Sequence, residues 1–444
     1  MERRTFLSLL ALPAVAQLLQ ACGDEAATTD STNGSNGSNG SPLQPSSLMG
    51  GAARVTATNA DAVDASAAIN AFAADLFERL VAIDPTANLV FSPASIALAL
   101  TMTSAGAAGQ TLAEMNTVLH ITDQTTIHRS MNGLGASFAS VNKSVDNTSE
   151  GGEGTSQVQL SIANSLWGQA GYSFEQAFLD VLSSEYGAGL ELVDYKTDPE
   201  AARLAINAWV DEQTKQRIPE LLPKDSIHVD VRLTLVNAIY LKANWAATFD
   251  DALTVAEPFA APAGEVTAQM MHTMAELAFG EGEGWRAVEI PYVFNDLSFL
   301  VAMGESADTA MPSVDEAAGA LTGRLVDLGL PKFDIETATS LADVLGAMGM
   351  ASAFDDRNEF TGMSSERPGL YIGDVIHQAN ITVDEEGTEA AAATAVIMVA
   401  ESAPQEPPTP VVFTVDRPFT FWLRDLATGT VIFAGRVNDP SATR

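Results

Sequence analysis

The order of the periodic patterns constrains the fold of this chain more than any other feature. Apolar residues three and four positions apart, which predict helices, recur at 66–82, 93–105, 109–119, 128–141, 174–186, 198–216 and 339–350. Strand patterns occur at 158–168, 231–241, 286–293, 297–303, 370–383, 410–415, 419–424 and 430–436. Helices gather early and strands late, without the regular alternation of a doubly wound sheet. This order predicts an α+β fold.

The sequence predicts a single globular domain over residues 66–440. No internal repeat is visible there, and no second linker interrupts it. The nearest interruption is the Gly-, Ser- and acid-rich stretch 146–157, which we expect to be a loop.

The first 22 residues resemble the export signal of a bacterial lipoprotein. Arg3 and Arg4 precede an apolar run too short to span a membrane, and Cys22 follows a small residue as in a lipobox. Residues 3–7 also resemble a twin-arginine motif, so both general and twin-arginine export stay open. We expect 1–21 to be a signal peptide and 22–65 a lipidated cysteine with a flexible tether. The anchor would lie in a bacterial membrane, facing the cell surface or the periplasm, with release to the medium as the alternative.

Composition excludes several partners and activities. The net charge of −35 opposes binding to nucleic acid and to heparin-like polyanions, and the single cysteine allows no disulfide within the chain. The five histidines have no metal-ligand spacing, and we find no phosphate loop or nucleophile elbow. We therefore expect no metal, no cofactor and no enzyme, although a Ser-His-Asp site assembled in space stays open.

The stretch from Asp384 to Phe419 is the most informative segment. Gly387 can act as a hinge, and the run from there to Ala403 contains no proline. Its alanines and glutamates favour a helix, whereas Thr394–Val399 favours a strand.

Several motifs, in order along the chain, resemble those of the serpin family of protease inhibitors. They are Asn88–Ile96, Asn207–Val210, Leu235–Trp245, Leu330–Phe333, Leu345–Met350, Val383–Thr394 and Asp416–Phe421. The resemblance implies three β-sheets, eight or nine α-helices and an exposed reactive loop at about 385–410. It also implies a suicide mechanism, in which a cleaved loop inserts into the largest sheet and traps the acylated protease.

By this resemblance the loop hinge comprises Glu385, Glu386, Gly387, Thr388, Glu389, Ala390, Ala391, Ala392, Ala393 and Thr394. Every second residue of an inserted strand faces the core. Counting from Thr388 to Ala400, none of the core-facing residues is charged. The family span of about seventeen residues from Glu385 places the scissile bond between Glu401 and Ser402. A glutamate there suggests a glutamate-preferring protease. A cut nearer Met398 would suggest an elastase-like or subtilisin-like one.

The resemblance also assigns residues that hold the sheet closed. Ser92, Ser95, Asn237 and His377 match the shutter, where the sheet parts, and Trp245 matches the breach, where insertion begins. The alternative is that these are ordinary polar and aromatic core residues. Glu386 stands where many members carry a basic residue, so the partner of Glu385 is open.

The resulting interpretation is a monomeric suicide inhibitor of serine-type endopeptidases that is lipid-anchored through Cys22, with cysteine proteases as a further target class. Two alternatives stay open. One is a non-inhibitory binding or carrier lipoprotein with the serpin fold, and the other is a surface or adhesive lipoprotein.

Overall fold

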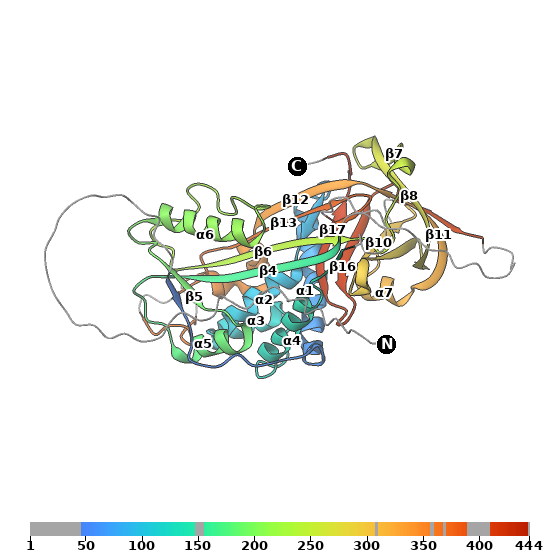
Figure 1. The fold of residues 1–444 in the computed structure, drawn as a ribbon. Coiled ribbons are helices and arrows are strands. Elements are labelled where there is room, and N and C mark those ends of the chain that lie inside the picture. The colour runs from blue at the N-terminus through green and yellow to red at the C-terminus, as the bar shows by residue number, and fades with distance from the viewer. Residues whose placement is uncertain are drawn as a thin grey trace, which may run out of the picture. The chain divides into compact units, whose positions relative to one another are not determined.

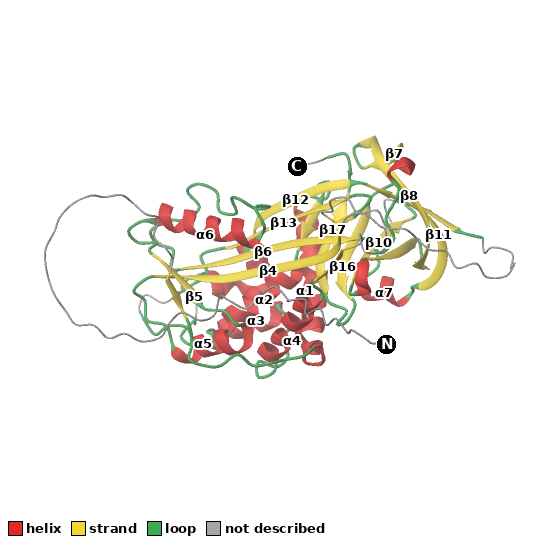
Figure 2. Ribbon diagram, viewed as in Figure 1, coloured by secondary structure: helices red, strands yellow, loops and turns green. Residues whose placement is uncertain are grey.

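Two long strands, β4 (Thr155–Gln169) and β6 (Leu233–Asn244), form the centre of the first sheet. A computed structural model describes residues 46–146, 155–306, 310–355, 359–366, 370–388 and 409–442. β6 is an almost continuous apolar run because helices cover both of its faces. Helix α6 (Pro199–Gln213) packs on one face of the β4–β6 pair, and helix α2 (Pro93–Ser104) packs on the opposite face (Figure 2).

The order of the first sheet is β1-β5-β4-β6-β14-β13-β12, with β3 added to β4. The remaining strands of this sheet are β1 (Ser46–Leu48), β3 (Lys143–Asp146), β5 (Leu190–Val193), β12 (Phe333–Ser340), β13 (Val375–Val383) and β14 (Gly387–Thr388).

The order of the second sheet is β15-β11-β8-β9-β10-β16-β17-β2, with β7 added to β8. Its strands are β2 (Leu89–Phe91), β7 (Val255–Ala261), β8 (Gly264–Gly282), β9 (Trp285–Pro291), β10 (Leu297–Gly304), β11 (Thr322–Pro331), β15 (Val411–Thr414), β16 (Phe419–Asp425) and β17 (Val431–Val437). β8 is long enough to pair with β7 and β11 along most of its length and with β9 at its end. The three sheets implied by the resemblance are therefore hydrogen-bonded here as two.

The other α-helices are α1 (Val63–Ile83), α3 (Gly109–Val118), α4 (Ile127–Ser140), α5 (Gln176–Val181), α7 (Val314–Gly319) and α8 (Ala342–Leu345). The π-helical turns η3 (Leu182–Tyr186) and η6 (Gly346–Met350) extend α5 and α8. Single 3-10 turns are η1 (Asn59–Ala62), η4 (Asp251–Leu253), η5 (Val293–Asn295) and η7 (Ala351–Phe354).

Helix α2 is buried at every position except Leu98. It begins at Pro93, and the hydroxyl of Ser92 caps it by accepting a hydrogen bond from the Ser95 amide at 3.2 Å. This cap fixes α2 directly beneath the first sheet. The predicted α+β class is confirmed. Within the part of the chain that the structure describes, we find no helix with the length and apolar character needed to cross a membrane.

Candidate loop-insertion site

The first sheet has a line of weak pairing between β6 and β13. These strands are parallel, and their pairing covers Leu235–Ala238 on β6 and Val375–Gln378 on β13. Figure 1 shows β6 and β13 as neighbours. Further along, the short strand β14 lies between them, with Thr388 opposite Ala243 on one side and Val383 on the other. The start of the predicted hinge is therefore already a strand within the sheet.

Backbone contacts at the end of β6 hold the hinge in this position. The Glu386 carbonyl accepts a hydrogen bond from the Trp245 amide at 2.8 Å, and the Asp384 carboxylate accepts from the Glu386 amide at 3.0 Å. Burial raises the pKa of Asp384. Gly387 has a φ of 156°, and a Cβ there would lie 2.0 Å from the Ala243 carbonyl oxygen. The strand can therefore approach β6 this closely only with glycine at position 387.

Glu385 has two partners, which answers the question that the sequence leaves open. Its carboxylate forms an ion pair with Lys332 and accepts a hydrogen bond from the Thr254 hydroxyl at 2.7 Å. Burial opposes ionisation of this carboxyl, but Lys332 and Thr254 outweigh it, so the pKa of Glu385 is lowered. The ion pair with Lys332 fixes the turn between β13 and β14.

Thr388, the first predicted insertion residue, is 2% exposed. Its hydroxyl lies 2.6 Å from that of Tyr292, and the Tyr292 ring stacks on Trp245 with centroids 4.6 Å apart. The Trp245 indole donates a hydrogen bond to the Asp384 carbonyl at 2.9 Å. Trp245 therefore lies beside β14, and Tyr292 is a further residue there that the sequence analysis missed.

Four predicted shutter residues lie together at the β6–β13 line and the start of α2. His377 and Asn237 are opposite each other in register, and the Ser92 amide donates to His377 Nε2 at 3.1 Å. Asn164 of β4, which the sequence analysis did not single out, joins the group. It accepts from the Ser95 hydroxyl at 2.9 Å and from the Asn237 side chain at 3.3 Å. No local pattern could have identified it, because its position opposite Asn237 depends on the register between β4 and β6.

His377 is fully buried, and burial lowers its pKa to about 3. Because Nε2 accepts the Ser92 amide, the proton of the neutral ring must be on Nδ1. Among the residues that the structure describes, neither His377 Nδ1 nor Asn237 Oδ1 has a hydrogen-bond partner. Burying these two polar atoms without a partner costs free energy.

The remaining predicted positions lie outside the described residues. These are Cys22, the hinge residues Glu389–Thr394, and Glu401 and Ser402 at the predicted scissile bond. Among the residues that are described, no group of three or more His, Cys, Asp or Glu side chains is placed to hold a metal ion.

Comparisons with known proteins agree with this geometry. A sequence profile described as Serpin (serine protease inhibitor) matches residues 67–440. An uncharacterised serpin-like protein of Thermococcus kodakarensis is 36% identical over 380 residues, covering 84% of this chain and 85% of that protein. Leukocyte elastase inhibitor of Sus scrofa is 35% identical over 393 residues, covering 84% and 99%.

Solved structures give the same result. Native tengpin, a thermophilic serpin, superposes with a TM-score of 0.74 and 25% identity, covering 89% of this chain and all of that one. The structure described as cleaved Serpin 42Da superposes with a TM-score of 0.73 and 27% identity, covering 86% and 100%.

Proposed function

Because this chain belongs to the serpin family, we propose that it is a suicide inhibitor of serine-type endopeptidases. The observation that carries the proposal is the position of Thr388. A loop whose first insertion residue is already paired with β6 and β13 needs only to continue along the same line to become a full strand.

The proposed reaction begins as ordinary proteolysis. The protease serine Oγ attacks the Glu401 carbonyl carbon, the bond to Ser402 breaks, and the Ser402 amine takes up the proton of the serine hydroxyl. Glu401 then carries the protease as an acyl ester. Insertion of Glu389 to Glu401 between β6 and β13 would carry the protease away from the loop exit before water hydrolyses this ester.

The sequence of the loop supports insertion. After Thr388, the residues that would face the core are Ala390, Ala392, Thr394, Val396, Met398 and Ala400, none of them charged. A charge on that face would oppose insertion, because an unpaired buried charge costs several kcal/mol.

The target class follows from the cleavage position. With Glu401 before the cut, we propose a glutamate-preferring protease as the target. A cut between Met398 and Ala400 would instead suit an elastase-like or subtilisin-like protease. The similarity to leukocyte elastase inhibitors is a reason to include an elastase-like protease in the test.

The test is incubation with three purified proteases: a glutamyl endopeptidase, an elastase and subtilisin. We expect an SDS-stable complex with at least one of them, and mass spectrometry of the released C-terminal peptide identifies the cut. The melting temperature of the cleaved protein should rise sharply. Cleavage without a complex and without a rise in melting temperature would overturn the proposal and indicate a binding or carrier protein.

We further propose that the mature protein is lipid-anchored through Cys22. The basic start, the short apolar run and the small residue before Cys22 support this. Expression in a bacterial host with a labelled fatty acid tests it. The wild-type protein should be labelled and sediment with membranes, whereas Cys22→Ser should be unlabelled. Equal labelling of both proteins would contradict the anchor.

A further inference from the structure

The turn between β9 and β10 holds a phenylalanine in a left-handed backbone conformation. The turn Tyr292–Asn295 is closed by the Asn295 amide, which donates to the Tyr292 carbonyl at 3.1 Å. Phe294, at its third position, has a φ of 70° and a ψ of −8°. Glycine or asparagine is normally found at such a position, because a Cβ is strained there. Among the described non-glycine residues with positive φ, Phe294 is the only one with an apolar side chain.

The Phe294 side chain lies on the surface of the protein. It is 36% exposed, and within the described part of the chain it belongs to neither hydrophobic core. A single exposed apolar side chain needs no explanation. One that also strains its own backbone is different, because such strain is typical of residues retained for contact with another molecule.

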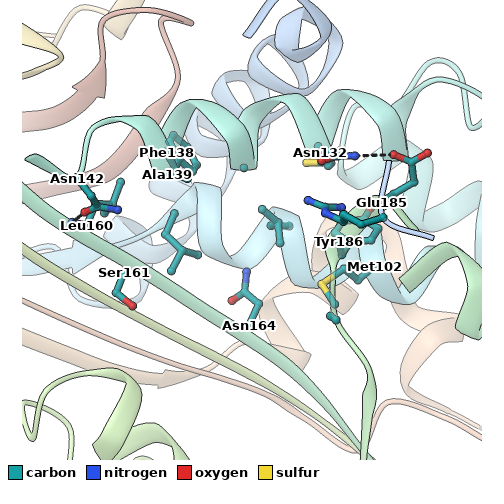
Figure 3. A pocket seen from close by; sticks show the side chains of 16 residues that line it. Met102, Asn132, Phe138, Ala139, Asn142, Leu160, Ser161, Asn164, Glu185 and Tyr186 are labelled. Atoms are coloured by element: carbon teal, nitrogen blue, oxygen red, sulfur yellow. Dashed lines mark hydrogen bonds between the residues drawn. The ribbon is translucent and has the colours of Figure 1, made fainter. Parts of the chain in front are cut away.

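Contacts below the turn hold it in place. The Asp296 carboxylate forms an ion pair with Lys143 at 2.5 Å. β3 begins at Lys143 and is itself fixed to β4, because the Leu160 amide donates to the Asn142 side chain at 2.6 Å (Figure 3). Phe294 is therefore presented on a pre-formed scaffold, which lowers the entropy cost of binding a partner.

The turn lies beside the hinge of the reactive loop. The Tyr292 hydroxyl lies 2.6 Å from that of Thr388, two residues before Phe294 along the chain. On the other side of the hinge, the Thr254 hydroxyl donates to Glu385, and the residues before and after Thr254 are 51% and 46% exposed. Exposed apolar side chains thus lie on both sides of the hinge. We name this set the hinge patch: Leu253, Val255 and Phe294.

We propose that the hinge patch docks the body of the target protease, with Phe294 as its anchor residue. The proposal rests on the proposed function, because a protease that acts on the reactive loop must approach the surface at which the loop begins. An aromatic side chain on a fixed turn is typical of interface anchors, since it buries a large area with few rotamers to order. Asp250 and Asp251 are exposed beside Leu253. The complementary protease surface is therefore an apolar pocket with basic side chains at its edge.

Three substitutions at position 294 separate the contact from the backbone strain. Phe294→Ala removes the ring and keeps the strained Cβ, whereas Phe294→Gly removes both. Phe294→Tyr keeps the ring and the strain. All three should fold, because the side chain belongs to no core. The melting temperature of Phe294→Gly should be about 2 °C above that of Phe294→Ala, because only glycine relieves the strain.

The measurement uses whichever of the glutamyl endopeptidase, elastase and subtilisin forms an SDS-stable complex with the wild type. With its catalytic serine replaced by alanine, this protease binds without acylation, so its Kd measures docking alone. We expect the Kd to rise at least about fivefold in Phe294→Ala and in Phe294→Gly, and to stay unchanged in Phe294→Tyr. The second-order rate constant for inhibition of the active protease should fall by the same factor.

Two further variants test the extent of the patch. Leu253→Ala, on the other side of the hinge, should also raise the Kd, by a smaller factor because leucine buries less area than phenylalanine. Ile83→Ala is the control, because Ile83 is 66% exposed at the end of α1 and lies outside the patch. Its Kd should match that of the wild type.

An unchanged Kd in both Phe294→Ala and Phe294→Gly would overturn the docking proposal while leaving the proposed function intact. A change in melting temperature without a change in Kd would do the same, because it would assign Phe294 to stability alone. If the wild type forms no SDS-stable complex with any of the three proteases, the proposed function fails, and the docking proposal fails with it.

Discussion

The hydroxyl groups of Tyr292 and Thr388 lie 2.6 Å apart, so Thr388 is hydrogen-bonded inside the first sheet. Tyr292 belongs to the segment between β9 and β10, and its ring stacks on Trp245 at the end of β6. The second sheet therefore holds the beginning of the loop against the first.

Replacing Tyr292 with phenylalanine should loosen the hinge. The variant loses one buried hydrogen bond, worth about 1 kcal/mol, and leaves the Thr388 hydroxyl without this partner. We expect amide exchange at Gly387 and Thr388 to accelerate about fivefold. Hydrogen–deuterium exchange of the native protein measures this. Tyr195→Phe is the control, because its hydroxyl bonds to Thr234, away from the hinge. Unchanged exchange in Tyr292→Phe would show that the hydroxyl pair does not hold the hinge.

Thr388→Arg should convert the inhibitor into a substrate. Position 388 is buried between β6 and β13, so arginine would displace the hinge and then oppose insertion of the cleaved loop. We expect cleavage to continue and the SDS-stable complex to disappear. An undiminished covalent complex in this variant would contradict the insertion mechanism.

Glu385→Gln should reduce stability at neutral pH but not at low pH. Burial alone would raise the pKa of Glu385, but Lys332 and Thr254 lower it overall from the ordinary value of 4.5. A carboxyl with a lowered pKa stabilises the fold above its unfolded-state pKa, and this stabilisation is lost as the pH falls through the folded-state value. We expect a loss of about 1 kcal/mol at pH 7, which disappears as the pH falls through the lowered folded-state pKa of Glu385. Thermal denaturation of both proteins from pH 7 to pH 3 tests this, and a constant difference would contradict it.

His377 should make the shutter sensitive to acid. Its pKa falls from 6.5 in the unfolded chain to about 3 in the fold because the ring is buried. Between these values the unfolded state binds one more proton, so stability falls as the pH drops from about 6.5 toward 3. In His377→Gln the slope of unfolding free energy against pH should be smaller by up to about 1.4 kcal/mol per pH unit. Denaturant unfolding between pH 6 and pH 4 measures the slope. His120→Gln is the surface control, and equal slopes in wild type and His377→Gln would refute the assignment.

Much of the fold can be predicted from local patterns. Each of the seven predicted helical stretches contains a helix, and each of the eight predicted strand stretches contains a strand, with bounds shifted by a few residues. The pattern did not reveal β8 (Gly264–Gly282), which is rich in Met, Ala and Glu. Because its two ends pair with different neighbours, its exposed and buried residues do not alternate along its whole length.

The site could be predicted only where a motif marked it. His377 and Asn237 were found through motifs, but Asn164 depends on a register between distant strands that no local pattern contains. The ordered segment 46–58, which the sequence analysis placed in the flexible tether, was missed for another reason. Its Gly- and Ala-rich sequence lacks periodicity, and its structure comes from contacts with Asp180, Ser183 and Asn132.

Under the proposed mechanism, the two-residue strand β14 changes the kinetics of loop insertion after cleavage. Starting a new strand inside a sheet is normally the slow step, because several residues lose conformational freedom before their hydrogen bonds compensate. With Gly387 and Thr388 already ordered, insertion would be a propagation step rather than a nucleation step. The speed of propagation relative to ester hydrolysis would then set how many inhibitor molecules are consumed for each protease trapped.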